Sequence, residues 1–309
     1  MFDFRGIASG GYGGYEATDQ LLYNIKFFLD FGIVNNGGYN NHYRDTSSFY
    51  ENDESQLKLA IDERYPSGQV WEGIGREWVW ESGVSAPSGG IDPINISGIY
   101  INDVFYPRDT SGVYAHHMDY RHGRVIFDLP QTFEDKIQVE YSSRKVHVGF
   151  ADSLEFQQLL LNALEEFLTD VTPSGTPSRD HQIWLPAIFI DMERGKQDGL
   201  QLGGGQIKTR TIAFHVFADN PYDRNLLMDW LDYQTRKVFW IADLNAIPFP
   251  FDHYGDLITG TTNWQDLTNN YPWKKIRVTD GTVQKINSMN TKVFRAKIIW
   301  KVEIDFGNI

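Results

Sequence analysis

Three glutamates beside tryptophans are the first groups in this sequence that could do chemistry. Each lies next to one indole in the chain: Glu72 beside Trp71, Glu77 beside Trp78 and Glu81 beside Trp80. Paired carboxylates cleave the glycosidic bond in many sugar hydrolases, and aromatic rings stack on the sugar. The same segments also alternate large apolar and charged residues, as a strand with one buried and one solvent-facing side does. The alternation favours solvent-facing acids and core tryptophans over a catalytic site.

His117 and Asp119 are the best candidates for a metal site. Residues two apart on a strand share one face, so this imidazole and this carboxylate could bind one ion. No third ligand follows at a diagnostic spacing, and the absence of cysteine excludes thiolate catalysis and cysteine metal sites. The sequence also has no Gly-x-Ser-x-Gly elbow, His-Glu-x-x-His helix or Walker loop. It therefore predicts no enzyme, no metal and no cofactor.

Glycine-rich stretches occur twice, and neither has the context of a phosphate-binding loop. Residues 9–15 lack the preceding strand and the spacing that such a loop needs, and they indicate a flexible arm. Gly203, Gly204 and Gly205 join two predicted strands, so no helix N-terminus is present there to bind phosphate. These three glycines favour a hairpin turn or a close approach of neighbouring backbone, and we take them as interface candidates.

Charge is distributed unevenly along the chain. The net formal charge of −13 argues against a protein whose main role is to wrap nucleic acid. Residues 1–150 carry 12 basic and 21 acidic groups, a net of −9, whereas residues 273–301 carry eight basic groups and one acid, a net of +7. The candidate interface cations in that segment are Lys274, Lys275, Arg277, Lys292, Arg295 and Lys297. They suit an acidic partner ring or transient contact with passing DNA; the alternative is the solvent face of the terminal strands.

Aromatic residues make up 15% of the chain, which suits either sugar binding or extensive subunit interfaces. Predicted contact residues are Tyr12 and Tyr15 in the glycine-rich arm and Tyr39 and Tyr43 in a polar loop. The first residues lack the order of a signal peptide, and no apolar run reaches the length of a membrane span. We expect a soluble protein made in the cytoplasm, without membrane contact.

The first half of the chain predicts one helix followed by short strands. Apolar residues recur at helical spacing between positions 18 and 33. Beyond residue 70 the period changes to two, and turn signals at Asn102-Asp103 and at Gly123 mark two hairpins. A further strand is expected at 136–148. Six or more short strands predict an antiparallel β-sandwich or barrel with one helix for residues 1–150.

The second half, residues 151–309, predicts an α+β unit, and we place the domain boundary near residue 150. A capping-box-like start at Asp152 opens a helix that ends before Pro173. Asn220 as N-cap and Pro221 at the first position open a second helix. Strands are expected at residues 183–190, 207–218, 275–278, 283–286 and 292–305. The order predicts one sheet with two helices.

Two parts of the sequence resemble proteins of bacteriophage particles. Asp119-Tyr120, Gly123-Arg124-Val125-Ile126-Phe127, Pro130 and Val139-Glu140-Tyr141 are similar to a hairpin pattern of phage neck, tail and baseplate β-modules. Residues 153–306 resemble, in element order, the tail terminator and tail-completion proteins, which covers about half of the chain. The resemblance implies a ring, usually a hexamer, that caps the tail tube and joins it to the head–tail connector. The first 150 residues exceed the minimal unit of that family.

The expected role is therefore that of a structural virion protein at the neck or tail end of a tailed phage. Expected partners are further copies of the chain, the tail tube or sheath protein and a connector or neck protein. The protein would be made in the host cytoplasm and reside in the virion. The alternative is a carbohydrate-binding module of a baseplate or tail fibre, based on the aromatic side chains Trp71, Trp78, Trp80, Tyr39 and Tyr43.

Overall fold

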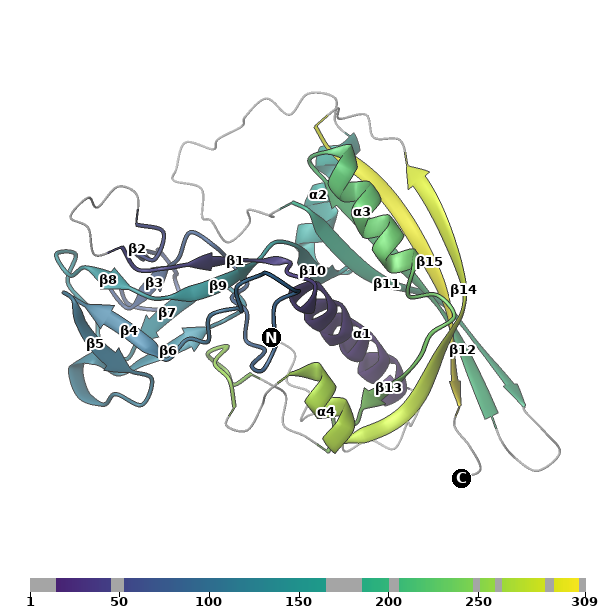
Figure 1. The fold of residues 1–309 in the computed structure, drawn as a ribbon, viewed down its shortest axis with the longest axis horizontal. Helices are drawn as coiled ribbons and strands as arrows, with labels where there is room; N and C mark the ends of the chain where they lie inside the picture. Colours follow the sequence, from purple (N-terminus) through teal and green to yellow (C-terminus); the bar gives the residue numbers. More distant parts are fainter. Residues whose placement is uncertain are drawn as a thin grey trace.

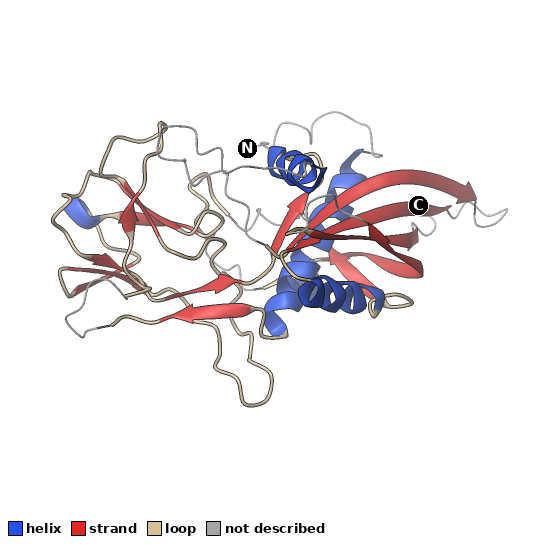
Figure 2. Cartoon of the chain, turned by 90° about the horizontal axis from the view of Figure 1, so that it is seen from above, coloured by secondary structure: helices blue, strands red, loops and turns tan. Residues whose placement is uncertain are grey.

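The computed structural model describes residues 15–45, 53–164, 185–199, 206–246, 251–258, 263–286 and 292–305. This part of the chain is α+β, as the sequence predicts, with four α-helices and a majority of strands. One large curled sheet lies at one end of the molecule and small antiparallel sheets lie at the other (Figure 1). The α-helices gather around the large sheet (Figure 2).

Six strands form the large sheet in the order β10-β11-β12-β15-β14-β13. Their bounds are β10 His147–Phe150, β11 Ala187–Gly199, β12 Gln206–Ala218, β13 Val238–Ala242, β14 Pro272–Ile286 and β15 Phe294–Asp305. β10 pairs with β11 in parallel, and the other neighbouring pairs are antiparallel. The two strands predicted at 275–278 and 283–286 are one strand, β14, with a register shift between Val278 and Asp280.

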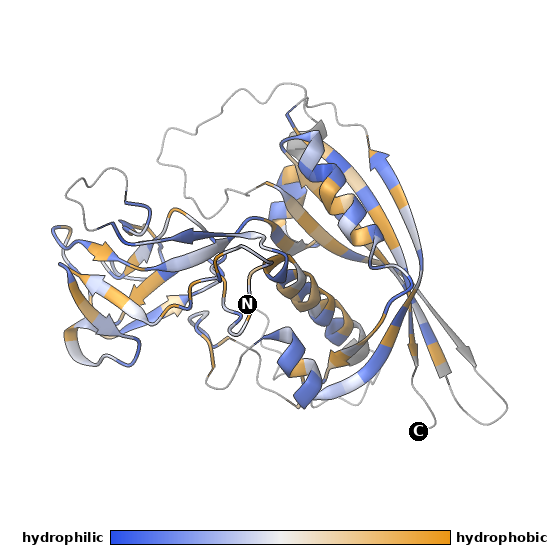
Figure 3. Ribbon diagram, viewed as in Figure 1, coloured by the Kyte–Doolittle hydropathy of each residue, from blue (hydrophilic) through white to orange (hydrophobic). Residues whose placement is uncertain are grey.

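Helix α1, Tyr15–Asn35, lies in the concave side of this curled sheet (Figure 1). Its apolar residues Leu21, Ile25, Leu29 and Ile33 are buried in one core with the apolar side chains of the sheet. Apolar and hydrophilic residues alternate along β14 and β15, so the sheet has an apolar concave face and a mixed convex face (Figure 3). Both α1 and β10 lie within residues 1–150, yet they pack with strands that follow residue 150.

Asn24 fixes the helix to the end strand of the sheet. Its side-chain amide donates to the carbonyl oxygen of Ala242 at 3.0 Å, and its carbonyl oxygen accepts from the Ala242 N–H at 2.7 Å. Asn24 is fully buried. The two bonds satisfy backbone groups at the edge of β13, where an open strand edge would otherwise invite pairing.

The strands of the first half form three small antiparallel sheets, β1-β9, β2-β3-β7-β6 and β5-β4-β8. Their bounds are β1 Tyr39–His42, β2 Lys58–Leu59, β3 Val70–Glu72, β4 Gly98–Ile101, β5 Val104–Pro107, β6 His116–Asp119, β7 Arg124–Phe127, β8 Ile137–Gln138 and β9 Tyr141–Arg144. Both predicted hairpins are confirmed. Asn102 and Asp103 turn between β4 and β5 with φ of 50° and 68°, and Gly123 turns between β6 and β7 with φ of 67°.

The segment 77–81 is not a strand, which corrects the alternating pattern expected there. Trp78 makes only an isolated bridge, to Ser143. The N–H of Trp78 donates to the Tyr120 carbonyl and the N–H of Val79 to that of Ser142, so the segment is enclosed by two different neighbours. Glu81 is 1% exposed. The expectation of solvent-facing acids is wrong because this segment is covered on both sides.

Three further helices accompany the large sheet: α2 Leu154–Leu164, α3 Pro221–Asp232 and α4 Trp264–Asn270. Asn220 caps α3 as predicted, since its side chain accepts from the N–H of Asp223. α3 packs beside α1 on the concave face. α2 covers one end of the convex face, where Phe156 contacts Phe189 and Phe217. The sequence did not predict α4 or β13.

Candidate functional site

Ser143, His42 and Glu54 form a hydrogen-bond chain with the order of a serine hydrolase triad. His42 Nε2 lies 2.8 Å from Ser143 Oγ, and His42 Nδ1 lies 3.1 Å from Glu54 Oε2. Such a chain can transfer a proton from a hydroxyl nucleophile, provided that a substrate carbonyl reaches the hydroxyl. The sequence analysis missed this constellation because no motif surrounds Ser143 and the three residues are far apart in the chain.

The surroundings of Ser143 do not admit a substrate. Ser143 is 4% exposed and lies within strand β9. A Cβ added to Gly75 would lie 2.5 Å from the Ser143 hydroxyl oxygen, so backbone covers the group that would have to attack. Burial also lowers the pKa of His42, with Glu54 opposing the shift in part. The hydrogen bond between His42 and Ser143 is buried and joins β1 to β9, and Glu54 reaches His42 from the surface, where its side chain is 64% exposed.

Glu81, one of the acids beside a tryptophan, forms a buried ion pair. Arg144 Nη2 donates to the two carboxylate oxygens of Glu81 at 2.7 and 2.6 Å. The side chains of Arg144 and Glu81 are 4% and 0% exposed. Burial raises the pKa of Glu81, although Arg144 favours the ionised form. Arg144 also donates to the carbonyl of Asp30 at 3.0 Å, so this pair connects β9 to helix α1.

Glu77 makes the second interior ion pair, with His147 of β10. His147 Nδ1 lies 2.8 Å from Glu77 Oε1, and its Nε2 lies 3.7 Å from Glu155 of α2. Burial opposes the charge on His147, but the Glu77 carboxylate outweighs it and raises the pKa of the imidazole. Burial likewise opposes the charge on Glu77, and His147 outweighs it, lowering the Glu77 pKa to about 2. Both groups therefore serve as an ionic link inside the fold.

The proposed metal pair His117 and Asp119 has other partners. His117 Nε2 lies 3.1 Å from Asp128 Oδ1, and its ring stacks on Tyr254 with a centroid distance of 4.0 Å. Asp119 binds His122 at 2.6 Å. Within the described ranges no group of three or more His, Asp or Glu side chains is arranged to hold a metal ion.

The aromatic contact candidates divide into buried and exposed rings. The three tryptophans Trp71, Trp78 and Trp80 are 4%, 1% and 5% exposed, so they pack in the core and present no ring for a sugar. Tyr39 is also buried, and its hydroxyl donates to the Ile91 carbonyl at 2.6 Å. Tyr43 is 50% exposed. A shallow hollow of about 280 Å³ beside Tyr39 is lined mainly by loop residues.

Two basic candidates of the last strand, Arg295 and Lys297, contact other residues of the same chain. Arg295 is 8% exposed and lies 5.3 Å from the ring centre of Phe217. Burial lowers the pKa of Arg295. Lys297 forms an ion pair with Glu193 of β11. Lys292 lies exposed before β15. Tyr12, Gly203, Gly204 and Gly205 lie outside the described residues, and Tyr15 begins α1.

Other basic candidates lie where β13 and β14 meet. Lys275 and Arg277 are exposed, and register pairs them with Trp240 and Val238, which are 45% and 55% exposed. The Lys275 ammonium lies 4.8 Å from the ring centre of Trp240. We call Val238, Trp240, Lys275 and Arg277 the basic–aromatic surface. Lys274 is half-buried and alternates to the other side of β14.

A shallow depression of about 220 Å³ lies on this surface, and Ile207 and Glu303 complete its lining together with Val238, Lys275 and Arg277. Neither Val238 nor Trp240 was among the predicted contact residues. Their alternation with the more buried Phe239 and Ile241 was the available signal, but five residues make a weak strand pattern.

Acidic groups occur on the opposite side of the convex face. The Ala151 N–H donates to the Ile190 carbonyl at 2.9 Å, which brings Asp152 close to Asp191. Asp152 is exposed, and the Asp191 side chain is 45% exposed. Leu154, the first residue of α2, is 58% exposed. We call Asp152, Leu154 and Asp191 the acidic edge.

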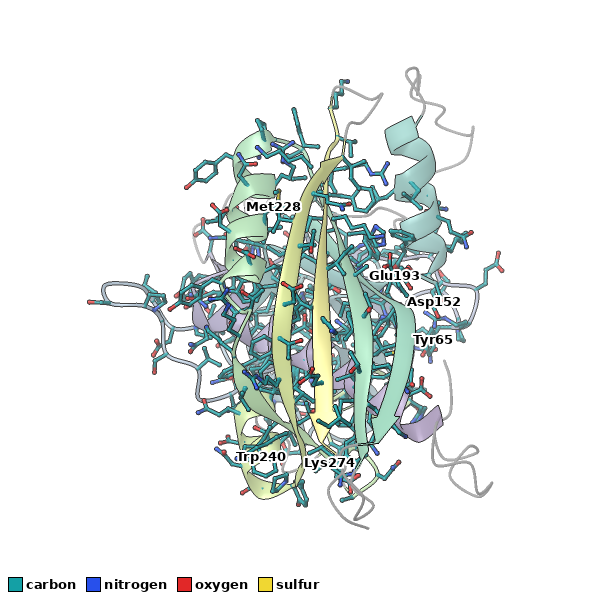
Figure 4. All side chains as sticks on the ribbon, turned by 90° about the vertical axis from the view of Figure 1, so that its right-hand side faces the viewer. Tyr65, Asp152, Glu193, Met228, Trp240 and Lys274 are labelled. Carbon is teal, nitrogen blue, oxygen red and sulfur yellow. The ribbon has the colours of Figure 1, made fainter. Side chains whose placement is uncertain are left out.

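Figure 4 shows the convex face with no helix across the centre of the sheet. Trp240 lies toward one lateral edge of the sheet, and Asp152 and Glu193 lie toward the other (Figure 4). Lys275 and Arg277 are exposed beside Trp240 and Val238, and Asp152 is exposed toward the opposite edge, so the convex face has exposed cations near one edge and an exposed acid near the other. This arrangement can bind another macromolecule through a broad surface.

Among the described residues, no helix is both long and apolar enough to cross a membrane. The sequence matches no model of a known protein family and no curated protein.

Proposed function

We propose that this chain is a structural virion protein of a tailed bacteriophage. It assembles as a closed ring, a hexamer by the family resemblance, at the neck or tail end. There it terminates the tail tube and connects it to the head–tail connector. Its role is to bind protein, not to transform a small molecule.

The order of elements supports this proposal. The hairpin β6–β7 carries Asp119, Gly123 and Arg124, the residues of the phage β-module pattern. The second half continues as α2, β11, β12, α3, β13, α4, β14 and β15. Apart from the additional β13 and α4, this order agrees with the one on which the resemblance to tail terminator proteins rests.

The observation that carries the proposal is the open convex face of the large sheet. Monomeric proteins usually cover a sheet of this size on both sides or keep its outer side polar. Here Val238, Trp240 and Leu154 are exposed at its two sides, next to charges of opposite sign. Different surfaces that bind each other head to tail generate a ring when the rotation between copies closes.

The carbohydrate-binding alternative has less support. Of the aromatic residues on which it rests, the three tryptophans and Tyr39 are buried, and Tyr43 is exposed. One ring beside a shallow hollow offers little stacking area for a sugar chain.

The experiment is to measure the mass of the purified full chain by light scattering and native mass spectrometry, and to image it by negative-stain electron microscopy. We expect closed rings, and we expect added protein to bind one end of isolated tails that lack this chain. A protein that stays monomeric at every concentration, and binds neither end of the tails, contradicts the proposal. Binding to the distal end alone would move the role to the baseplate.

A further inference from the structure

The acidic edge and the basic–aromatic surface belong to the same sheet but lie on opposite sides of it (Figure 4). The residues of the basic–aromatic surface lie on β13, at one end of the strand order, and on its neighbour β14. Of the acidic edge, Asp191 lies on β11, next to β10 at the other end of the order, and Asp152 and Leu154 follow β10 in the chain. Strands β12 and β15 lie between the two surfaces, so the two surfaces of one copy do not reach each other. Each surface is therefore open to another molecule.

We propose that the acidic edge of one copy binds the basic–aromatic surface of the next copy. This inference rests on the proposed function, because it names the contact through which the ring forms. Each surface binds a second copy of this chain, because every copy carries both an acidic edge and a basic–aromatic surface.

The chemistry of the two surfaces is complementary in charge. Asp152 and Asp191 would face Lys275 and Arg277, which attracts the two copies and orients their encounter. The same surface placed against its own kind would bring two cations, or two acids, together. The charges therefore favour a contact between unlike surfaces. In a head-to-tail contact each pair of copies keeps one free surface of each kind and can grow into a ring, whereas a two-fold dimer would use both surfaces at once and stop at two copies.

The apolar groups are complementary as well. Leu154 projects from the start of α2 with Asp152 nearby, and its exposed fraction of 58% leaves an apolar side chain in water. The depression of about 220 Å³ on the other surface is lined by the apolar Ile207, Val238 and Ile276 together with two cations, Lys275 and Arg277, and one acid, Glu303. A leucine seated there would be desolvated at the centre of a charged rim, which is the arrangement of an interface hot spot.

The two outer strands of the sheet differ in how open their edges are to a neighbouring copy. Asn24 closes the edge of β13 at Ala242, so that edge is not available there for strand pairing. β10 pairs with β11 only as far as Ile190. Beyond Ile190, within the described residues, the outer edge of β11 has no strand beside it, so a neighbouring copy can approach next to Asp191.

The test uses two full-chain variants that each remove one surface. Variant one carries W240A, K275A and R277A; variant two carries D152A, L154A and D191A. Control variants remove exposed groups in the first half of the chain, on strand β2 and in loops. They are K58A with R121A for the first variant, and D109A, L129A and E134A for the second. Mass is measured by analytical ultracentrifugation, and folding by circular dichroism.

We expect each variant alone to be a folded monomer with self-association weakened by about tenfold or more. The controls assemble as the wild type does. A one-to-one mixture of the two variants retains one intact pair of surfaces, so it forms dimers and nothing larger. The size of the wild-type assembly separates the two geometries: a two-fold dimer stops at two copies, whereas the head-to-tail contact continues to a larger ring.

Three results would overturn the inference. Variants that form rings like the wild type leave the proposed function in place but show that these surfaces do not make the ring. Variants that form normal rings yet lose tail binding show that the surfaces hold a different partner. A mixture that stays monomeric excludes the head-to-tail contact. A wild-type chain that is itself monomeric, alone and with tails, instead contradicts the proposed function.

Discussion

Charged side chains have opposite roles in the interior of this molecule and on the convex face of its large sheet. In the interior, Glu81 with Arg144 and Glu77 with His147 are enclosed and paired, and they join α1, β9 and β10. On the convex face, Lys275 and Arg277 remain exposed beside apolar groups. The interior charges therefore determine stability, because removing one partner leaves a buried charge. The exposed charges are available for binding, because water already solvates them.

Removing residues 1–150 should have the largest effect. The fragment 151–309 lacks α1, whose Leu21, Ile25 and Leu29 fill the concave face of the sheet. We expect no cooperative unfolding transition in urea, whereas the full chain shows one, because the apolar face would be open to water. A fragment that unfolds cooperatively would show that the second half is stable without the helix.

Breaking the ion pair between Glu81 and Arg144 should have the next largest effect. We expect R144A to lower the free energy of unfolding by about 3–5 kcal/mol, since it leaves the Glu81 carboxylate buried and unpaired. The double variant E81L/R144M should recover most of this loss, because it removes both charges and fills the space. R64A is the matched control: Arg64 pairs with Asp62 but its side chain is 63% exposed, so about 1 kcal/mol or less is expected. Equal losses in R144A and R64A would contradict the distinction.

The pair between Glu77 and His147 predicts how stability depends on pH. The pKa of His147 is raised in the folded protein, so its contribution is present below its ordinary value of 6.5 and is lost as the pH rises through the raised value. The pKa of Glu77 is lowered to about 2, so its contribution is present above 4.5 and is lost as the pH falls toward 2. Urea midpoints of the wild type should decline as the pH rises above 6.5 and through the raised pKa of His147. H147Q should flatten that decline, and H117Q, which changes a half-buried histidine, should not.

Truncating the basic–aromatic surface should have the smallest effect on stability. Trp240 is 45% exposed and its neighbour Lys275 is exposed, so W240A/K275A should change the free energy of unfolding by about 0.5 kcal/mol or less. The measurement is urea denaturation at a concentration where the wild type is monomeric, so that assembly does not contribute. A loss of several kcal/mol would assign these residues to the fold and not to an interface.

Local sequence signals predicted much of the secondary structure. The turn at Asn102-Asp103, the turn at Gly123 and the cap at Asn220 were found because each depends on the conformation of a few adjacent residues. The helix predicted at 18–33 is α1 at Tyr15–Asn35, because its apolar period is long enough to be recognised. The short elements β13 and α4 were missed because five or seven residues carry too little of a period.

The candidate site was predicted only in part. Lys275 and Arg277 were found from the charge of their segment, and their partners Val238 and Trp240 were not. Arg295 and Lys297 belonged to the same basic segment, yet one packs on Phe217 and the other pairs with Glu193. Net charge along the chain does not say which acids the neighbouring strands place opposite each cation.

Local sequence is sufficient for the features that depend on neighbouring residues: the α+β class, the hairpin turns, the cap at Asn220 and the absence of cysteine chemistry. The predicted cap at Asp152 is wrong, since the Ser153 hydroxyl accepts from the N–H of Phe156 at the start of α2. Only the tertiary structure decided which acids are buried, that α1 fills the concave side of a sheet formed mostly by the second half, and which charges remain on the convex face. The physical reason is that burial and pairing depend on contacts between residues more than a hundred positions apart, such as Asn24 with Ala242 and Asp30 with Arg144. A local pattern constrains the path of the backbone, but the partner across the core decides whether a charge meets water, an opposite charge or another molecule.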